Sequence, residues 1–253
     1  MDPIVTSLIV LICIFGSAML GLLVRNRFPD DHLSPDTKEV VKLVVGIVGT
    51  MTGMVLGLLV ASAKSSFDAQ RSGVEQLAAN VVVLDKCLAH FGDESKGARE
   101  VLKVSVEDMI QRIWPSEGGA ARGEAGVGHG GRYDDVYDRI LNLTPKNDAQ
   151  KTTQAQALKV VHDTAEMRWL LYAQRSSSIP TVFLVLMVAW LAITFASYGL
   201  FAPGHGTTYA VLLLGSLVVS SAVFLILELE RPFGGIMHIS STPLKNAMML
   251  LGK

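Results

Sequence analysis

Four long apolar segments constrain the fold of this 253-residue chain more than any other feature of its sequence. None of them contains Asp, Glu, Lys, Arg or His. Each has about 20 residues, the number that an α-helix needs to cross roughly 30 Å of hydrocarbon. The sequence therefore predicts an all-α membrane protein with four spans that pair into two hairpins, residues 4–24 with 43–63 and residues 179–202 with 207–227.

A polar stretch separates the two hairpins and carries most of the charged residues. Its roughly 115 residues are enough for one soluble helical domain, inserted between spans 2 and 3. The predicted organisation is a first transmembrane hairpin, this helical domain, a second transmembrane hairpin and a C-terminal segment, with bounds 1–63, 64–178, 179–229 and 230–253.

Apolar residues at helical spacing predict the helices of the soluble domain. No helix breaker follows the second span, so we expect it to continue as one long helix with the inward stripe Val74, Leu77, Val81, Leu84, Leu88 and Phe91. A second helix ends at Trp114, and residues 116–131 form a glycine-rich loop. A short helix over 133–143 and a long helix over 148–178 follow, and the long one turns Leu158, Val161, Ala165, Trp169 and Tyr172 inward.

The second span has small residues at every fourth position: Gly49, Gly53, Gly57 and Ala61. Such a pattern lets helix backbones approach closely, so these residues predict a packing seam against another helix. A second interpretation is that the same helix lines a pore. The two are compatible, because one face can pack while Thr50, Met54 and Leu58 face a constriction.

The absence of ionisable residues from the four spans excludes several classes of membrane protein. Proton relays, voltage sensors and many ion-coupled carriers place charged residues inside the membrane. A passive channel needs none, because hydroxyl groups, constriction size and flanking charge can select the ion. A membrane-anchored signalling or scaffold protein without transport activity remains the alternative.

Charged residues gather where the second and fourth spans end: Lys64, Asp68, Arg71, Glu228, Glu230 and Arg231. If the hairpins pack together, we expect Arg231 to pair with Asp68 or Glu228, because pairing limits the cost of desolvation. These residues can serve as ordinary interfacial anchors. Alternatively, Lys64 repeated around an oligomer makes a positive ring that concentrates anions at the mouth of a pore.

Other chemistry is not indicated by the sequence. His162 and Glu166 lie four residues apart on a helix, but two ligands without a third do not make a metal site. No catalytic motif, metal site or cofactor site is recognisable, so we expect no enzyme. The formal net charge of −1 gives no reason to expect nucleic acid as a partner.

Three motifs resemble the bacterial bestrophin-like family of membrane proteins. The first runs from Gly57 through Phe67, Asp68 and Arg71, and the second is residues 195–203. The third is Leu225-Ile226-Leu227-Glu228-Leu229-Glu230-Arg231-Pro232-Phe233, followed by Gly235, Ile236, Ser240 and Pro243. Glu230 stands where the family usually has Asp, which keeps the charge in place.

The resemblance implies a homo-oligomeric ion channel. True bestrophins, distant relatives of this family, are pentameric anion channels with four spans per subunit, cytoplasmic termini and a pore lined by the second span. The implied location is the bacterial inner membrane, with termini and middle domain in the cytoplasm, an orientation that the Lys and Arg flanking the spans slightly favour. The bulky neck residues of true bestrophins have no counterpart in the second span of this chain, and their calcium-binding acidic cluster has none in residues 234–253.

Overall fold

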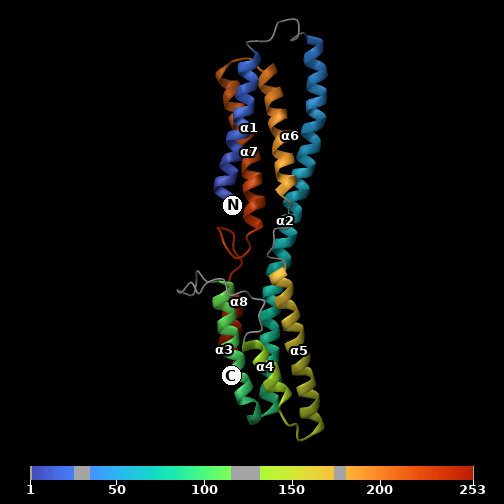
Figure 1. Cartoon of the computed structure of the whole chain (residues 1–253), viewed down its shortest axis with the longest axis vertical. Coiled ribbons are helices and arrows are strands. Elements are labelled where there is room, and N and C mark those ends of the chain that lie inside the picture. Colours follow the sequence, from blue (N-terminus) through green and yellow to red (C-terminus); the bar gives the residue numbers. More distant parts are fainter. Residues whose placement is uncertain (1, 26–34, 115–131, 174–180, 253) are drawn as a thin grey trace. The chain divides into compact units, whose positions relative to one another are not determined.

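The computed structural model describes residues 2–25, 35–114, 132–173 and 181–252, and its described regular elements are all helical. They are α1 Pro3–Arg25, α2 Pro35–Phe91, η2 Asp93–Ser95 (a 3-10 turn), α3 Lys96–Ile113, α4 Arg132–Leu141, α5 Asp148–Ala173, α6 Thr181–Phe201, α7 Gly206–Leu229 and α8 Thr242–Leu250 (Figure 1). The predicted all-α class is confirmed. The glycine-rich segment 116–131 lies outside the described residues.

Internal contacts divide the chain into two compact units. The first, which we call the membrane unit, comprises Met1–Phe67 and Ser177–Arg231. The second, the helical unit, comprises Asp68–Ser176 and Pro232–Lys253. Helix α2 supplies residues to both units, and the C-terminal segment joins the helical unit.

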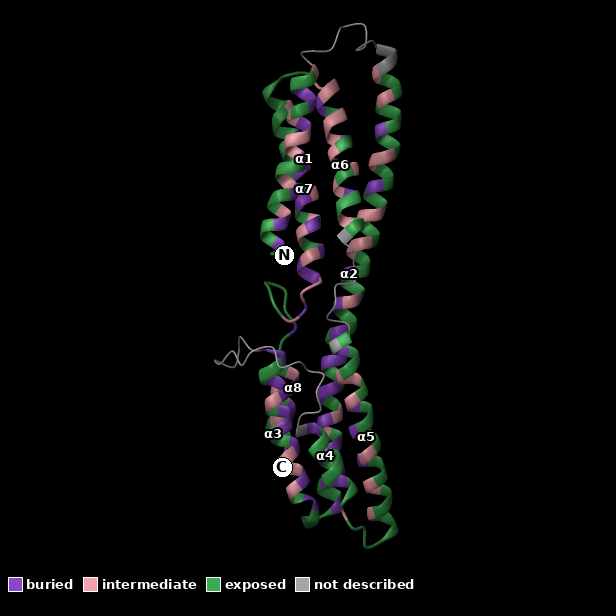
Figure 2. Ribbon diagram, in the orientation of Figure 1, coloured by how far each residue is buried: buried purple, intermediate pink, exposed green. Residues whose placement is uncertain are grey.

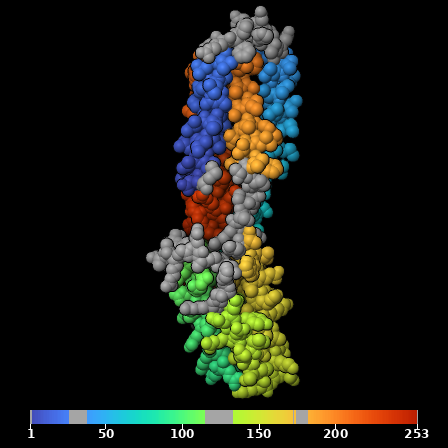
Figure 3. All heavy atoms as spheres, viewed as in Figure 1, coloured from blue at the N-terminus to red at the C-terminus, as the bar shows by residue number. Residues whose placement is uncertain are grey.

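The membrane unit contains the predicted spans. Helices α1, α6 and α7 and the apolar part of α2 are each long and apolar enough to cross a membrane, which confirms the four spans. Helix α1 packs along α6 and α7, and Figure 3 shows α1 and α6 side by side. Their shared core consists of Val10, Ile14, Met187, Leu191 and Val223, and Leu56 and Leu59 of α2 pack against it.

Helices α1 and α6 cross at two glycines. A Cβ atom on Gly21 would overlap the carbonyl oxygen of Ala196, and one on Gly199 would overlap that of Ala18. A larger residue at either position therefore forces the two backbones apart. This crossing is the small-residue contact that joins spans within one subunit.

The helical unit is built around the second half of α2. All six residues of its predicted inward stripe are buried, none more than 2% exposed, which confirms that prediction. The helix ends at Phe91 because the next residue, Gly92, has a φ of 108°, a value that side chains disfavour. Helix α3 packs against α4 and α8, and α4 packs against α5.

The predicted inward face of α5 was partly wrong. Trp169 is 56% exposed, whereas Val161 is buried as expected. Among the side chains of this helix that the structure describes, the buried ones are Ala157, Val161, Thr164 and Leu171; Tyr172 lies outside them. The buried face of α5 is therefore displaced by about one residue from the stripe that the sequence predicted.

Candidate functional site

Helix α2 has two different sides within the membrane unit. Val45 and Thr52 are buried, and Leu56 and Leu59 pack on the core of the unit. The hydroxyl of Thr52 donates to the carbonyl of Val48, 2.8 Å away, so it needs no partner from another helix. This side holds α2 to the rest of its own subunit.

The candidate pore-lining residues lie on the other side of α2. Met54 is 70% exposed and Leu58 is 61% exposed. Thr50 is also exposed, and its hydroxyl donates to the carbonyl of Gly46 at 2.9 Å. Figure 2 shows exposed residues recurring along this part of α2. We call Thr50, Met54 and Leu58, with the exposed Ile47 and Met51 beside them, the open face of α2.

The glycines of the predicted seam have little or no contact with the part of the subunit that the structure describes. A Cβ atom on Gly53 or Gly57 would have nothing within 4 Å, and one on Gly49 would lie 3.8 Å from the hydroxyl of Tyr198. Ala61 is exposed. A seam against a helix of a second copy stays a prediction.

Of the four spans, α2 is the least covered by its own subunit. Its most apolar window is 11% buried, against 28% for α1, 22% for α6 and 28% for α7. An apolar helix with so little contact inside the subunit must be covered by lipid or by another copy of the chain.

The predicted mouth residues have local partners. The ammonium of Lys64 lies 5.7 Å from the ring centroid of Phe67, a cation–π distance. Arg71 pairs with Glu75 at 3.2 Å on an exposed helix face. At the end of α7, Arg231 pairs with Asp2 at 3.4 Å.

Two acidic residues of the mouth set lie beside Arg231. Glu228 is buried, with 3% of its surface exposed, and Glu230 caps α7. The predicted pairings of Arg231 with Asp68 or Glu228, and the positive ring at Lys64, stay predictions.

The Pro-Phe motif after α7 anchors a buried tryptophan that sequence reasoning treated only as a helix end. Trp114 is 1% exposed, and its indole N–H donates to the carbonyl of Ile239 at 2.7 Å. The ring of Phe233 meets Trp114 edge-on, with centroids 5.7 Å apart. The segment after Pro232 is thereby held on the end of α3.

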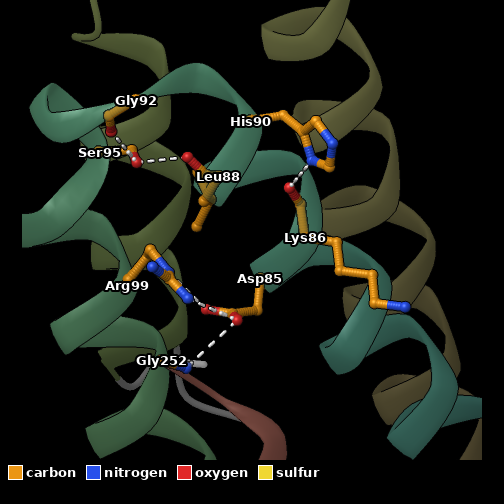
Figure 4. A network of polar contacts seen from close by, with 8 residues as sticks. All are labelled: Asp85, Lys86, Leu88, His90, Gly92, Ser95, Arg99 and Gly252. Atoms are coloured by element: carbon orange, nitrogen blue, oxygen red, sulfur yellow. Dashed lines mark hydrogen bonds and ion pairs between the residues drawn. The ribbon is translucent and has the colours of Figure 1, made fainter.

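A buried ion pair joins α2, α3 and the C-terminal segment (Figure 4). Arg99 donates to both carboxylate oxygens of Asp85, at 2.7 and 2.8 Å. The backbone N–H of Gly252 donates to the same carboxylate at 3.3 Å. The bidentate, charge-assisted geometry makes this a strong polar contact.

A second polar pair is buried between α4 and α5. The guanidinium of Arg168 lies 5.0 Å from the ring centroid of Tyr133. Burial raises the pKa of Tyr133 to about 12, although Thr164 and Arg168 oppose the rise. Burial also lowers the pKa of Arg168. Sequence reasoning missed this pair, because neither residue belongs to an apolar stripe.

Four apolar helices, whose described residues hold no charge within the bilayer-spanning stretch, define a multi-pass helical membrane protein. A family model described as the Bestrophin-like domain matches residues 12–244. The chain belongs to the Bestrophin-like family, as its motifs predicted. No curated protein matches it in sequence.

Solved structures with the same fold include two single-residue variants of a bacterial bestrophin homolog from Klebsiella pneumoniae. One has a TM-score of 0.66 at 14% identity, with 97% of this chain and 99% of that chain covered. The other has a TM-score of 0.69 at 13% identity, with 100% and 99% covered. A third crystal structure, described as a membrane protein, has a TM-score of 0.68 at 14% identity, with 98% and 99% covered. At these identities the likeness shows the fold alone.

Proposed function

We propose that the chain forms a homo-oligomeric, passive ion channel whose pore is lined by the open face of α2. Five copies surround the axis, by family resemblance, and anions are the conducted ions. The channel lies in the bacterial inner membrane, with both termini and the helical unit in the cytoplasm. The observation that carries the proposal is the low burial of α2, the span with the most glycine and the least contact in its subunit.

The chemistry of this helix supports passive conduction. The open face offers the Thr50 hydroxyl and apolar side chains at Met54 and Leu58, and the spans offer no group that takes up a proton during transport. A pore of this kind selects by size and by the charge at its ends. Lys64, about two turns beyond the last glycine of this part of α2, is the cation placed to attract anions there.

Passive flux is the test of conduction. Purified protein in liposomes is expected to release chloride down its gradient without an added energy source. No flux above that of protein-free liposomes contradicts the channel and favours the alternative that the sequence leaves open, a membrane-anchored signalling or scaffold protein.

Anion selectivity is tested at Lys64. Replacing Lys64→Glu reverses the charge at the proposed mouth, so the reversal potential in a chloride gradient is expected to shift toward cation permeability. The matched control is Lys86→Glu, the same change on the same helix about 33 Å away along its axis. An unchanged reversal potential in Lys64→Glu removes this residue from the account of selectivity.

A further inference from the structure

An apolar pocket in the membrane unit is lined by residues of α2, α6 and α7. Its volume is about 810 Å³, within the range of ligand-binding pockets. Side chains of Phe195, Tyr198, Phe201 and Leu212 line it, together with the backbone of Gly215. These residues belong neither to the open face of α2 nor to the mouth at Lys64.

The position of the pocket decides what can fill it. Lining residues run from Thr207 to Gly215 on α7, a rise of about 12 Å from the end of the span toward its middle. The pocket therefore begins at the level of the lipid headgroups and extends into the hydrocarbon layer. A bilayer offers acyl chains there, and an apolar pocket of this size gains dispersion contacts when a chain fills it.

Cations lie at one end of the pocket. Among the described lining residues Lys42 is the charged one, and it forms no ion pair with another side chain that the structure describes. A second cation, Arg25, lies next to the lining of the pocket. Its guanidinium donates to the carbonyl of Ala202, a lining residue, at 2.6 Å. The hydroxyls of Thr207 and Thr208 add hydrogen-bond donors at the same end.

We propose that this pocket binds an anionic phospholipid. An acyl chain lies against Phe195, Leu212 and Gly215, and the phosphate lies beside Lys42. Charge complementarity selects the headgroup, since one Lys near a membrane surface is worth about five-fold in affinity for anionic over neutral lipid. The proposal is independent of ion conduction, because a chain that conducts nothing can still bind lipid here.

Native mass spectrometry of the full chain in detergent tests the proposal. Phosphatidylglycerol and phosphatidylcholine with the same acyl chains are titrated separately. We expect one phosphatidylglycerol per subunit, retained about five-fold better than phosphatidylcholine. Lys42→Gln is expected to abolish that preference, whereas the control Lys38→Gln, one turn earlier on α2 and outside the lining, keeps it.

A second variant fills the pocket. Val211→Trp places an indole in the lining, and its matched control is Val218→Trp, since both valines are 67% exposed on α7 and only Val211 lines the pocket. Val211→Trp is expected to lose the bound lipid and Val218→Trp to keep it, with equal melting temperatures.

Three results overturn the proposal. They are equal retention of the two lipids by the unmodified chain, unchanged lipid binding in a folded Val211→Trp protein, and a disulfide cross-link between subunits through Val211→Cys. The last result means that a second copy fills the pocket. If Val211→Trp does not fold, the two lysine variants decide alone.

Discussion

At the scale of single residues, the helical unit depends on a few buried polar groups that have partners from distant parts of the chain. Asp85 accepts hydrogen bonds from Arg99 and from the backbone of Gly252. Trp114 reaches the carbonyl of Ile239. The Arg99 contact joins α3 to α2, and the other two contacts join the C-terminal segment to α2 and to the end of α3, so a change at one residue loosens more than one element.

Asp85→Asn is expected to destabilise the protein by about 2 kcal/mol, because the partly buried Arg99 guanidinium loses the charged acceptor of two hydrogen bonds. Thermal and denaturant unfolding of the purified protein measure the change. The control is Glu75→Gln, which breaks the exposed pair with Arg71 on the same helix and should cost less than about 0.5 kcal/mol. Equal losses in the two variants contradict the role of the buried pair.

Tyr133 gives the helical unit a dependence on alkaline pH. The folded protein holds its proton until the pKa of about 12, whereas an unfolded chain loses it near the usual value of about 10. The folded state thus binds more protons between these values, so stability is present below pH about 10 and is lost as the pH rises toward 12.

Tyr133→Phe removes this contribution, so the variant is expected to lose less stability than the parent between pH 10 and about 12. Unfolding midpoints at several pH values measure it. The control is Tyr137→Phe, on the exposed side of the same helix. Its stability is expected to fall with rising pH as that of the unmodified protein does. If the stability of Tyr133→Phe falls with rising pH as steeply as that of the unmodified protein, Tyr133 is not the source of the alkaline pH dependence.

At the scale of helices, two sets of glycines have different roles. Gly21 and Gly199 let α1 and α6 touch, whereas a Cβ on Gly53 or Gly57 would have no described atom of its own subunit within 4 Å. The first set holds the subunit together. The second set is free to meet another copy.

Gly199→Ala is therefore expected to destabilise the subunit by about 1–3 kcal/mol, because its Cβ overlaps the backbone of α1. Gly53→Ala is the same chemical change at a position with open space beside it, so it should not destabilise the subunit and should add up to about 1 kcal/mol through the higher helix propensity of Ala. Unfolding of detergent-solubilised monomer compares the two. If Gly53→Ala lowers the stability of the subunit more than Gly199→Ala does, the crossing of α1 and α6 is not the contact that holds the subunit together.

Apolar runs and stripes predicted most of these helices, because continuous or periodic apolarity is a strong signal. The same reasoning failed on α5, where Ala157, Thr164 and Arg168 face inward and Trp169 faces out. Apolarity alone points to the wrong face when small and polar residues make the contacts.

Two further contacts have signals in the sequence that the predictions did not use. Helix α8 begins at Thr242-Pro243, a good helix start, and buries Leu244 and Ala247. The crossing of α1 and α6 corresponds to small residues three apart in both spans, Ala18 with Gly21 and Ala196 with Gly199. The partners of Asp85, Trp114 and Tyr133 have no local signal, because their sequence separation gives no periodicity to detect.

At the scale of the whole molecule, the proposed channel is an assembly of several copies. A subunit whose glycine-rich span has an open apolar face satisfies two requirements of a pore-forming protein: one side attaches α2 to its own subunit, and the other can face an axis or a neighbouring copy. The pocket at Lys42 lies on different residues and is assigned to lipid.

Thiol block of ion flux through Met54→Cys tests the central claim most directly. The background is Cys13→Ser; Cys87 can remain, because burial shields its thiol and raises its pKa. A membrane-impermeant methanethiosulfonate is expected to remove most of the chloride flux of Met54→Cys and to leave that of Leu56→Cys, on the packed side, intact. Unchanged flux in labelled Met54→Cys, or equal block in both variants, contradicts a pore lined by the open face of α2.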